Sequence, residues 1–281
     1  EKELEKEREK EGKKTPFHEE EVFDPKILKG KNLNILKQFP KDTKKHLAVI
    51  PRECPSQQQA QKFFEEIPYF EEVWGKIRCS SAEQDIQDLL EEEEVLPEET
   101  FKDPFFPHWL KEMSEVAIAF GASQGNDEIA FWLGGSRGCS LYHVDHVPYR
   151  LLVTYKGPGT EYVPEHAVDR KAFDNEDQDN VVKDPEAVKF MKRWDVAMFR
   201  GGPQGVVHRS PQAAKTEDSL LMRLDQVEFW ETIMNDEDQY YDSDEDGEGE
   251  EGEEGDEENG EGEACPLPEK KGPEHCRCSK E

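Results

Sequence analysis

The pattern of apolar residues changes at Gly121, and this change constrains the fold more than any other feature of the sequence. Between about residues 32 and 121, apolar residues recur at helical spacing. After Gly121, short β-rich runs are separated by Gly and Pro. Many short strands without intervening helices are typical of an antiparallel sandwich or barrel. We therefore expect an α+β protein, in which a helical N-terminal layer packs on a double-stranded β-helix (jelly roll) core.

Serines and a glycine mark the ends of the expected helices. Ser56 and Ser81 stand where N-cap residues stand, and Gly121 is a typical C-terminal stop. The pattern predicts helices over 32–39, 56–70, 81–93 and 108–120. It predicts strands over 129–133, 140–145, 149–155, 161–163, 196–199, 206–208 and 219–224.

Charge divides the chain further. Residues 235–263 contain seventeen Asp or Glu and no Lys or Arg, so the rest of the chain has a net charge of −13 out of the total of −30. Such low-complexity composition cannot bury an apolar core. We expect a charged, disordered segment over 1–30, a helical region over 31–122 and a jelly-roll metal-binding core over 123–230. The core would carry an acidic insertion near 165–190, and 231–281 would be a disordered acidic tail.

Composition also restricts the partners. No apolar run approaches the roughly 20 residues that cross a bilayer, so we expect no membrane insertion. The acidic balance disfavours nucleic acid, because phosphates are neutralised by Lys and Arg, whereas the tail suits a basic protein. Six scattered or tail cysteines do not form a dense disulfide framework. We expect an intracellular, reducing compartment, the cytoplasm or an organelle.

The sequence His143-Val144-Asp145, followed at a distance by His208, carries the chemistry. Residues at i and i+2 of a strand project from the same face of a sheet, so one ion can contact both side chains. A histidine from a distant hairpin would complete a set of two histidines and one carboxylate. Such a set typically holds Fe(II) with coordination positions left open, although zinc accepts the same ligands.

An arginine follows in an apolar strand. Arg223 lies within Leu220-Leu221-Met222-Arg223-Leu224, where burying its charge is costly without an anionic partner. A dicarboxylate co-substrate, held by the guanidinium fork, would be such a partner.

These residues resemble two groups of proteins. HxD, a distal His and an Arg some fifteen residues later resemble the Fe(II)/2-oxoglutarate-dependent oxygenases. The resemblance implies 2-oxoglutarate as co-substrate, held by Arg223, with Arg150 and Tyr155 as the reserve candidates for this cofactor-binding role. The strings Cys139-Ser-Leu-Tyr-His-Val-Asp145, Arg150-Leu-Leu-Val-Thr-Tyr-Lys-Gly-Pro-Gly-Thr-Glu161 and His208-Arg-Ser-Pro211 closely resemble an uncharacterised, mainly bacterial family with FHxD, TYxGPGTxW and HRSP signatures. The resemblance covers about 130–226, departs from the family at Tyr142 and Tyr162, and implies a loose association with zinc homeostasis.

Three interpretations of the sequence stay open. The first is an iron- and 2-oxoglutarate-dependent oxygenase, or an oxygenase-like protein, acting on an unknown protein or small molecule. The second is a non-catalytic, zinc-handling metal protein, and the third is an adaptor subunit that docks through its acidic tail. The polar residues could also be bonded only to loop backbone. A separate Cys/His cluster, of Cys265, His275, Cys276 and Cys278, is either a metal site or part of an inert tail.

Overall fold

A computed structural model describes residues 24–54, 56–137 and 140–230. Of the disordered segment expected over 1–30, residues 1–23 lie outside the described residues, as do the acidic tail, the Cys/His cluster and Cys139. Within the described remainder, Ile27–Lys29 form a strand, so the expected disorder is wrong there. The helices are α2 (Gln57–Glu66), α3 (Ala82–Glu92), α4 (Glu98–Lys102), α5 (Phe106–Gln124) and α6 (Arg170–Asp174), and the 3-10 helices are η1 (Leu33–Lys37), η2 (Phe39–Lys41), η3 (Cys79–Ser81), η4 (Glu165–Ala167), η5 (Pro185–Ala187) and η6 (Gln212–Lys215). The strands are β1 (Ile27–Lys29), β2 (Leu47–Ile50), β3 (Glu72–Arg78), β4 (Glu128–Gly134), β5 (Tyr149–Lys156), β6 (Glu161–Tyr162), β7 (Lys189–Phe190), β8 (Val196–Arg200), β9 (His208–Arg209) and β10 (Leu220–Gln226).

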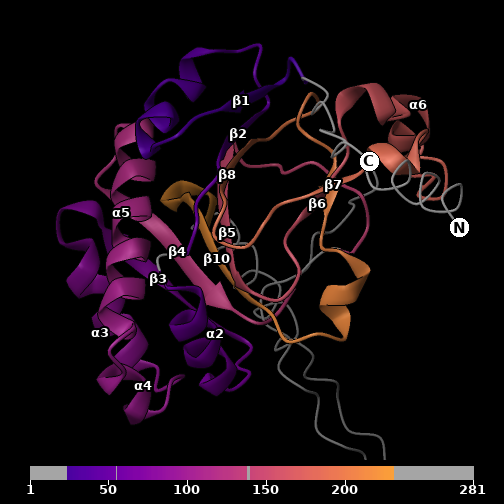
Figure 1. The fold of residues 1–281 in the computed structure, drawn as a ribbon. Coiled ribbons are helices and arrows are strands. Elements are labelled where there is room, and N and C mark those ends of the chain that lie inside the picture. Colours follow the sequence, from indigo (N-terminus) through magenta and orange to yellow (C-terminus); the bar gives the residue numbers. More distant parts are fainter. Residues whose placement is uncertain (1–23, 55, 138–139, 231–281) are drawn as a thin grey trace, which may run out of the picture.

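Two sheets organise the described residues (Figure 1). Seven strands form a large sheet in the order β1-β2-β8-β5-β10-β4-β3, antiparallel except for the parallel pair β1 and β2. A small antiparallel sheet has the order β7-β6-β9. The protein thus has the mixed helix and sheet content of the expected α+β class, with a seven-stranded sheet.

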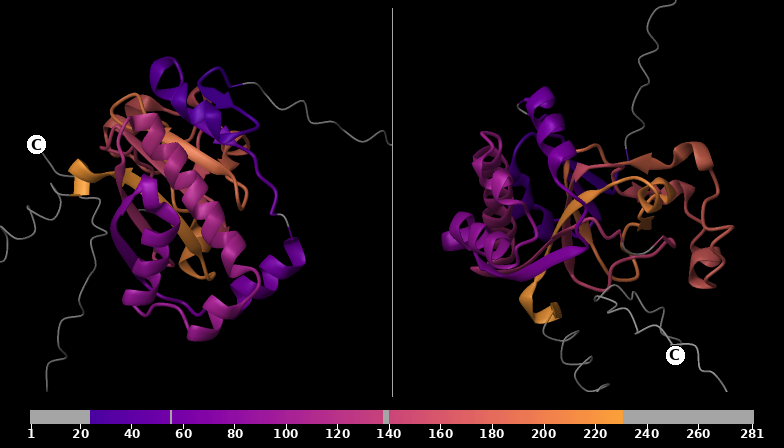
Figure 2. Two further views of the ribbon diagram at one scale, coloured as in Figure 1. Left: turned by 90° about the vertical axis from the view of Figure 1, so that its left-hand side faces the viewer. Right: turned by 90° about the horizontal axis from the view of Figure 1, so that it is seen from below.

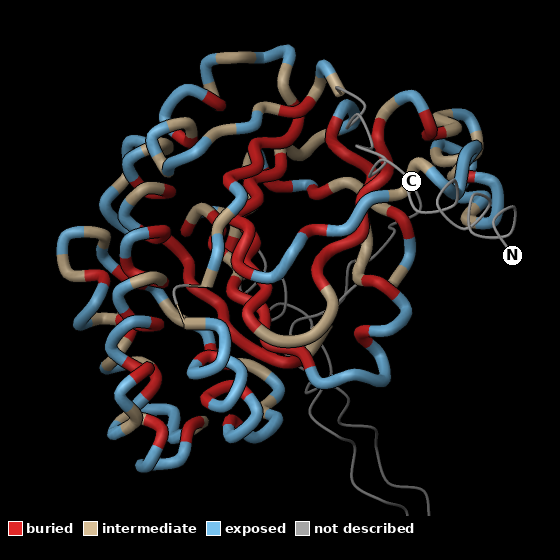
Figure 3. The backbone as a smooth tube through the Cα atoms, in the orientation of Figure 1, coloured by how far each residue is buried: buried red, intermediate tan, exposed pale blue. Residues whose placement is uncertain are grey.

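Helices α2, α3 and α5 cover one face of the large sheet, and the small sheet covers the other, with α6 on the side of the small sheet (Figures 1 and 2). On the helical side, residues of α2, α3 and α5 pack with alternate residues of the strands in one large apolar cluster. On the opposite side, Tyr162 of β6 and Val206 before β9 pack with Leu152 and Phe199 of the large sheet. Figure 3 shows the buried residues concentrated in the sheets. We call these two sides the helix face and the site face.

Two strands, β2 and β3, lie in the region that the sequence indicates to be mostly helical. β2 pairs with β8, and β3 pairs with β4 as one edge of the large sheet. The other edge is β1, from the segment expected to be disordered, which pairs with β2. β2 is a run of four buried residues, and a run so short does not distinguish strand from helix. β3 alternates in burial, but Gly75 and charged residues weaken its apolar pattern.

Other local predictions need correction. The segment 32–39 forms η1 and part of η2 instead of an α-helix, because Asn32 and Pro40 favour tight turns. The segment 140–145 is not a regular strand, since only His143 makes a bridge there, to His208. Helix α5 passes Gly121 and ends at Gly125, whose φ of 70° glycine adopts readily. Among the described helices, none has the length and apolarity needed to span a membrane.

Candidate metal centre

Three side chains from two segments that are far apart in sequence converge between the two sheets. His143 lies in the irregular segment before β5, Asp145 follows it, and His208 opens β9. One ligand atom from each lies within 4.8 Å of the other two. The backbones of His143 and His208 join in a reciprocal pair of hydrogen bonds of 3.0 and 2.9 Å. This bridge, rather than a long strand, brings the two imidazoles together, with ring centroids 4.4 Å apart.

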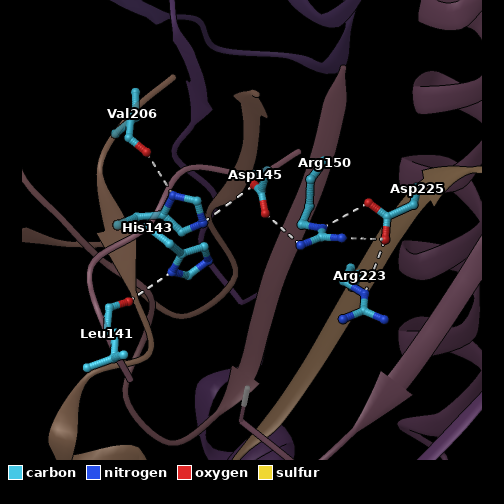
Figure 4. A network of polar contacts seen from close by, with 8 residues as sticks. Leu141, His143, Asp145, Arg150, Val206, Arg223 and Asp225 are labelled. Atoms are coloured by element: carbon cyan, nitrogen blue, oxygen red, sulfur yellow. Dashed lines mark hydrogen bonds and ion pairs between the residues drawn. The ribbon is translucent and has the colours of Figure 1, made fainter. Parts of the chain in front are cut away.

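Backbone carbonyls fix the orientation of both imidazoles (Figure 4). Nδ1 of His143 lies 2.9 Å from the carbonyl of Leu141, and Nδ1 of His208 lies 2.8 Å from the carbonyl of Val206. A carbonyl oxygen only accepts, so Nδ1 donates in each case, and the neutral ring carries its lone pair on Nε2. Such a bond to the other ring nitrogen is what metal-binding histidines usually make.

Asp145 is buried, with 3% of its surface exposed, and its two oxygens differ. Oδ1 accepts a hydrogen bond of 2.6 Å from Nη1 of Arg150. Oδ2 is buried without a hydrogen-bond partner and lies 3.4 Å from Nε2 of His208. One oxygen is therefore held by the protein, while the other faces the histidines.

The protonation states of Asp145 and His208 leave both facing atoms, Oδ2 of Asp145 and Nε2 of His208, as hydrogen-bond acceptors. Burial lowers the pKa of His208 to about 4, so this ring is neutral near pH 7. Burial works to raise the pKa of Asp145, but the charge of Arg150, with smaller contributions from His208, His143 and Arg223, lowers it to about 2. A carboxylate oxygen thus meets an imidazole lone pair with no proton between them. A cation satisfies both atoms, because metal–nitrogen and metal–oxygen bonds of about 2.1 Å set adjacent ligand atoms roughly 3 to 3.4 Å apart.

A row of alternating charges continues from Asp145 across the site face (Figure 4). Arg150 of β5 donates from Nε and Nη2 to the two oxygens of Asp225, at 2.9 and 3.2 Å. Asp225 of β10 is 1% exposed, and its Oδ2 lies 3.2 Å from Nε of Arg223. The row therefore runs Asp145, Arg150, Asp225, Arg223.

Indole rings flank Arg223 at the end of this row. Its guanidinium carbon lies 4.9 Å from the ring centroid of Trp132 and 4.9 Å from that of Trp230. Trp230 in turn stacks on Trp74, with centroids 5.4 Å apart and planes inclined by 11°. Contacts of this kind stabilise a cation and fix the plane of its fork. The anionic partner that an apolar strand requires for Arg223 is supplied within the protein, by Asp225.

The structure does not bring Tyr155 to this cluster. Successive residues of a strand point to opposite faces, so Tyr155 lies on the helix face and Arg150 on the site face. Tyr155 packs against Phe64, Trp109 and Trp194 in the core, and burial raises the pKa of its hydroxyl. Its proposed role as a reserve cofactor ligand is therefore withdrawn. Arg223 and Arg150 lie on the site face.

A second polar cluster locks the segments that carry the histidines. Glu161 of β6 is buried, and it accepts a hydrogen bond from the Tyr142 hydroxyl and another, of 3.0 Å, from Nε of Arg209. The Arg209 guanidinium carbon lies 4.1 Å from the centroid of the Tyr142 ring. Burial, and then the bond to Glu161, raise the pKa of Tyr142. Because Tyr142 precedes His143 and Arg209 follows His208, this cluster fixes both ligand segments against β6.

The sequence interpretation missed Asp225, Glu161 and the two carbonyls. Asp225 had a usable signal, since opposite charges at i and i+2 of an apolar strand share a face and pair. Glu161 follows a Gly-Pro turn and looks like an ordinary exposed residue in the sequence. Backbone carbonyls leave no trace in a sequence at all.

Comparison with known proteins places the chain in a family. Residues 30–225 match the model of a family described as a protein of unknown function (DUF1826). The chain belongs to this family. The match includes all three candidate ligands as well as the helix face and the site face, and it confirms the resemblance to an uncharacterised family. Comparison with the curated proteins found no match.

Several solved structures are similar to this chain at low identity. A full-length Neurospora crassa protein in complex with alpha-KG is 12% identical, with a TM-score of 0.29 over 71% of this chain and 84% of that one. IDO from Bacillus thuringiensis is 8% identical, with a TM-score of 0.35 over 69% and 98% of the two chains. A putative oxygenase from Shewanella oneidensis is 10% identical, with a TM-score of 0.30 over 71% and 88%.

Proposed function

We propose that this protein is an Fe(II)/2-oxoglutarate-dependent oxygenase, or an oxygenase-like protein, whose substrate is unknown. His143, Asp145 and His208 hold the metal, and Arg223 holds a carboxylate of the co-substrate. We also propose that the two sheets are the halves of a double-stranded β-helix. The observation that carries the proposal is the pair of facing acceptors, Oδ2 of Asp145 and Nε2 of His208, 3.4 Å apart and buried.

The set of donor atoms narrows the choice of metal. Two imidazoles and one carboxylate oxygen, on one side of an ion, suit Fe(II) with positions left for exchangeable ligands. The Nδ1 bonds to carbonyls leave only the Nε2 atoms for coordination, and Arg150 leaves only one Asp145 oxygen. The set therefore supplies three ligand atoms, fewer than the six positions of an octahedral ion.

Charge favours a dianionic co-substrate. Asp145 and Asp225 carry two negative charges, Arg150 and Arg223 carry two positive charges, and the row is neutral by itself. A divalent ion would add two positive charges to a buried site, where uncompensated charge is costly. A dicarboxylate such as 2-oxoglutarate would restore neutrality. Trp132 and Trp230 flank the faces of Arg223, which directs a carboxylate to the edge of the guanidinium.

The residues of the chain have separate tasks in this proposal. Fe(II) and 2-oxoglutarate, when bound, supply the activation of oxygen for oxidation of a substrate. The backbone carbonyls of Leu141 and Val206 hold the imidazoles in the ligating tautomer. Phe199, whose ring centroid lies 4.6 Å from that of His208, excludes water from one side of the site.

The test is succinate formation from 2-oxoglutarate in air by Fe(II)-loaded protein. We expect succinate to form only with Fe(II), and His208→Ala to abolish its formation. His146→Ala is the matched control, because His146 is exposed and adjoins Asp145 in the sequence. Metal analysis of the same samples distinguishes the two alternative functions. Tightly bound zinc without succinate would favour the zinc-handling protein, and absence of any bound metal would favour the adaptor.

A further inference from the structure

Arg150 directs all three of its guanidinium nitrogens at buried carboxylates of the protein. Nη1 donates to Asp145, while Nε and Nη2 donate to the two oxygens of Asp225. The side chain is 12% exposed, and its guanidinium carbon lies 5.8 Å from the ring centroid of Phe229. A co-substrate carboxylate could take the two-point fork of Nε and Nη2 only by displacing Asp225.

The backbone around Asp145 is held independently of Arg150. The amide of Gly202 donates to the Asp145 carbonyl at 2.8 Å. A Cβ at Gly201 would lie 1.9 Å from the carbonyl oxygen of Val147, so only glycine allows the loop to approach this closely. These contacts place the Cα of Asp145. They leave the rotation of its carboxyl group to be fixed by side-chain contacts.

Arg150 fixes the rotation of the Asp145 carboxyl group. Its bond of 2.6 Å to Oδ1 is the hydrogen bond that the described structure gives to the Asp145 carboxyl group. With Oδ1 occupied, Oδ2 is the oxygen that faces His208. Asp225 holds the guanidinium by a two-point fork from the neighbouring strand, one residue beyond the register pair of Leu224 and Leu151. A fork of this kind fixes the plane of an arginine, which a single contact does not.

We propose that Arg150, anchored by Asp225, is a positioning residue that presents a single oxygen of Asp145 to the metal. This inference rests on the proposed metal site and deepens it. It assigns Arg150 to the support of a ligand and Asp225 to the support of Arg150. Outer partners of metal ligands typically change metal affinity by 10- to 100-fold.

The experiment measures Co²⁺ binding, with its visible absorption spectrum, in wild-type protein and in variants. Arg150→Met alone leaves Asp225 buried without its main partner, so Arg150→Met/Asp225→Asn is the decisive variant. We expect Co²⁺ binding about 10- to 100-fold weaker in the double variant, with an altered spectrum, because the Asp145 carboxyl group can then turn. Arg150→Lys keeps a donor for Asp145 but loses the fork, and we expect an intermediate affinity.

The control is Arg52→Met/Glu112→Gln, which removes a partly buried ion pair on the helix face. We expect its Co²⁺ affinity and spectrum to match those of wild type. A double variant at Arg150 and Asp225 with wild-type affinity and spectrum would overturn the positioning role while leaving the metal site intact. Wild-type protein that binds no Co²⁺ would overturn both the positioning role and the proposed function.

Discussion

The same strands present opposite chemistry on their two faces. On β5, Val153 and Tyr155 lie in the apolar core of the helix face, whereas Arg150 lies on the site face. On β10, Met222 and Leu224 belong to the helix face, whereas Arg223 and Asp225 belong to the site face. A shift of one residue along a strand thus separates packing from charge. We infer that the helix face carries the stability of the domain and the site face carries its chemistry.

The largest effect expected on the helix face comes from Trp109→Ala. Trp109 is fully buried and contacts Phe63, Phe64 and Tyr155. Its removal leaves a cavity, and we expect the free energy of unfolding to fall by about 3–5 kcal/mol. Urea denaturation measures this change. Co²⁺ affinity of the folded variant should stay at the wild-type value, and a parallel loss of affinity would show that the two faces are not independent.

The largest effect expected on the site face comes from Asp145→Asn. The amide oxygen still accepts from Arg150, but the negative charge that faces His208 is lost. We expect metal affinity to fall by more than about 100-fold, beyond the range for outer partners. Calorimetric titration with Co²⁺ measures it, with His146→Ala as the control. Unchanged affinity in Asp145→Asn would remove this residue from the ligand set.

Within the site face, Arg223→Met distinguishes binding of the co-substrate from binding of the metal. Charged hydrogen bonds contribute about 1.5–3 kcal/mol, so we expect 2-oxoglutarate to bind metal-loaded protein roughly 10- to 100-fold more weakly. Metal affinity should change less, because Arg223 pairs with Asp225, and Arg150 stands between Asp225 and Asp145. Arg78→Met, at an exposed ion pair with Asp85, is the control. Equal loss of 2-oxoglutarate binding in both variants would argue against a specific clamp.

The smallest effect expected is that of Tyr155→Phe. The Tyr155 hydroxyl donates only to the sulfur of Met222, at 3.7 Å, so the free energy of unfolding should change by less than about 1 kcal/mol. Binding of 2-oxoglutarate should not change, because the ring lies on the helix face. Weaker 2-oxoglutarate binding in Tyr155→Phe would contradict the assignment of the two faces.

Local sequence patterns predicted much of the fold and the identity of the candidate ligands. The runs that became β4, β5, β8 and β10 are strongly apolar, and α2, α3 and α5 carry amphipathic patterns that the packing preserves. β1, β2 and β3 were missed, because short or interrupted runs acquire their structure from pairing, here of β1 with β2, β2 with β8 and β3 with β4. Pairing between distant segments is not encoded locally.

The candidate site shows the same limit. The spacing of His143 and Asp145 indicated a shared metal, but the regular strand assumed there is absent, and a single bridge to His208 brings the residues together. Arg150 and Tyr155 are an odd number of residues apart on β5, so they point to opposite faces. Assigning Tyr155 to the core could therefore have excluded it in favour of Arg150. The pairing of Arg150 with Asp225 depends on the neighbouring strand β10, which the sequence alone does not align.

The central claim is that His143, Asp145 and His208 bind one divalent metal ion. X-ray absorption of Fe(II)-loaded protein tests it most directly, because imidazole ligands give a characteristic scattering pattern. We predict two imidazoles at about 2.1 Å from the metal in wild-type protein, and one in each of His143→Ala and His208→Ala. A wild-type spectrum without imidazole, or one that both substitutions leave unchanged, would contradict the account.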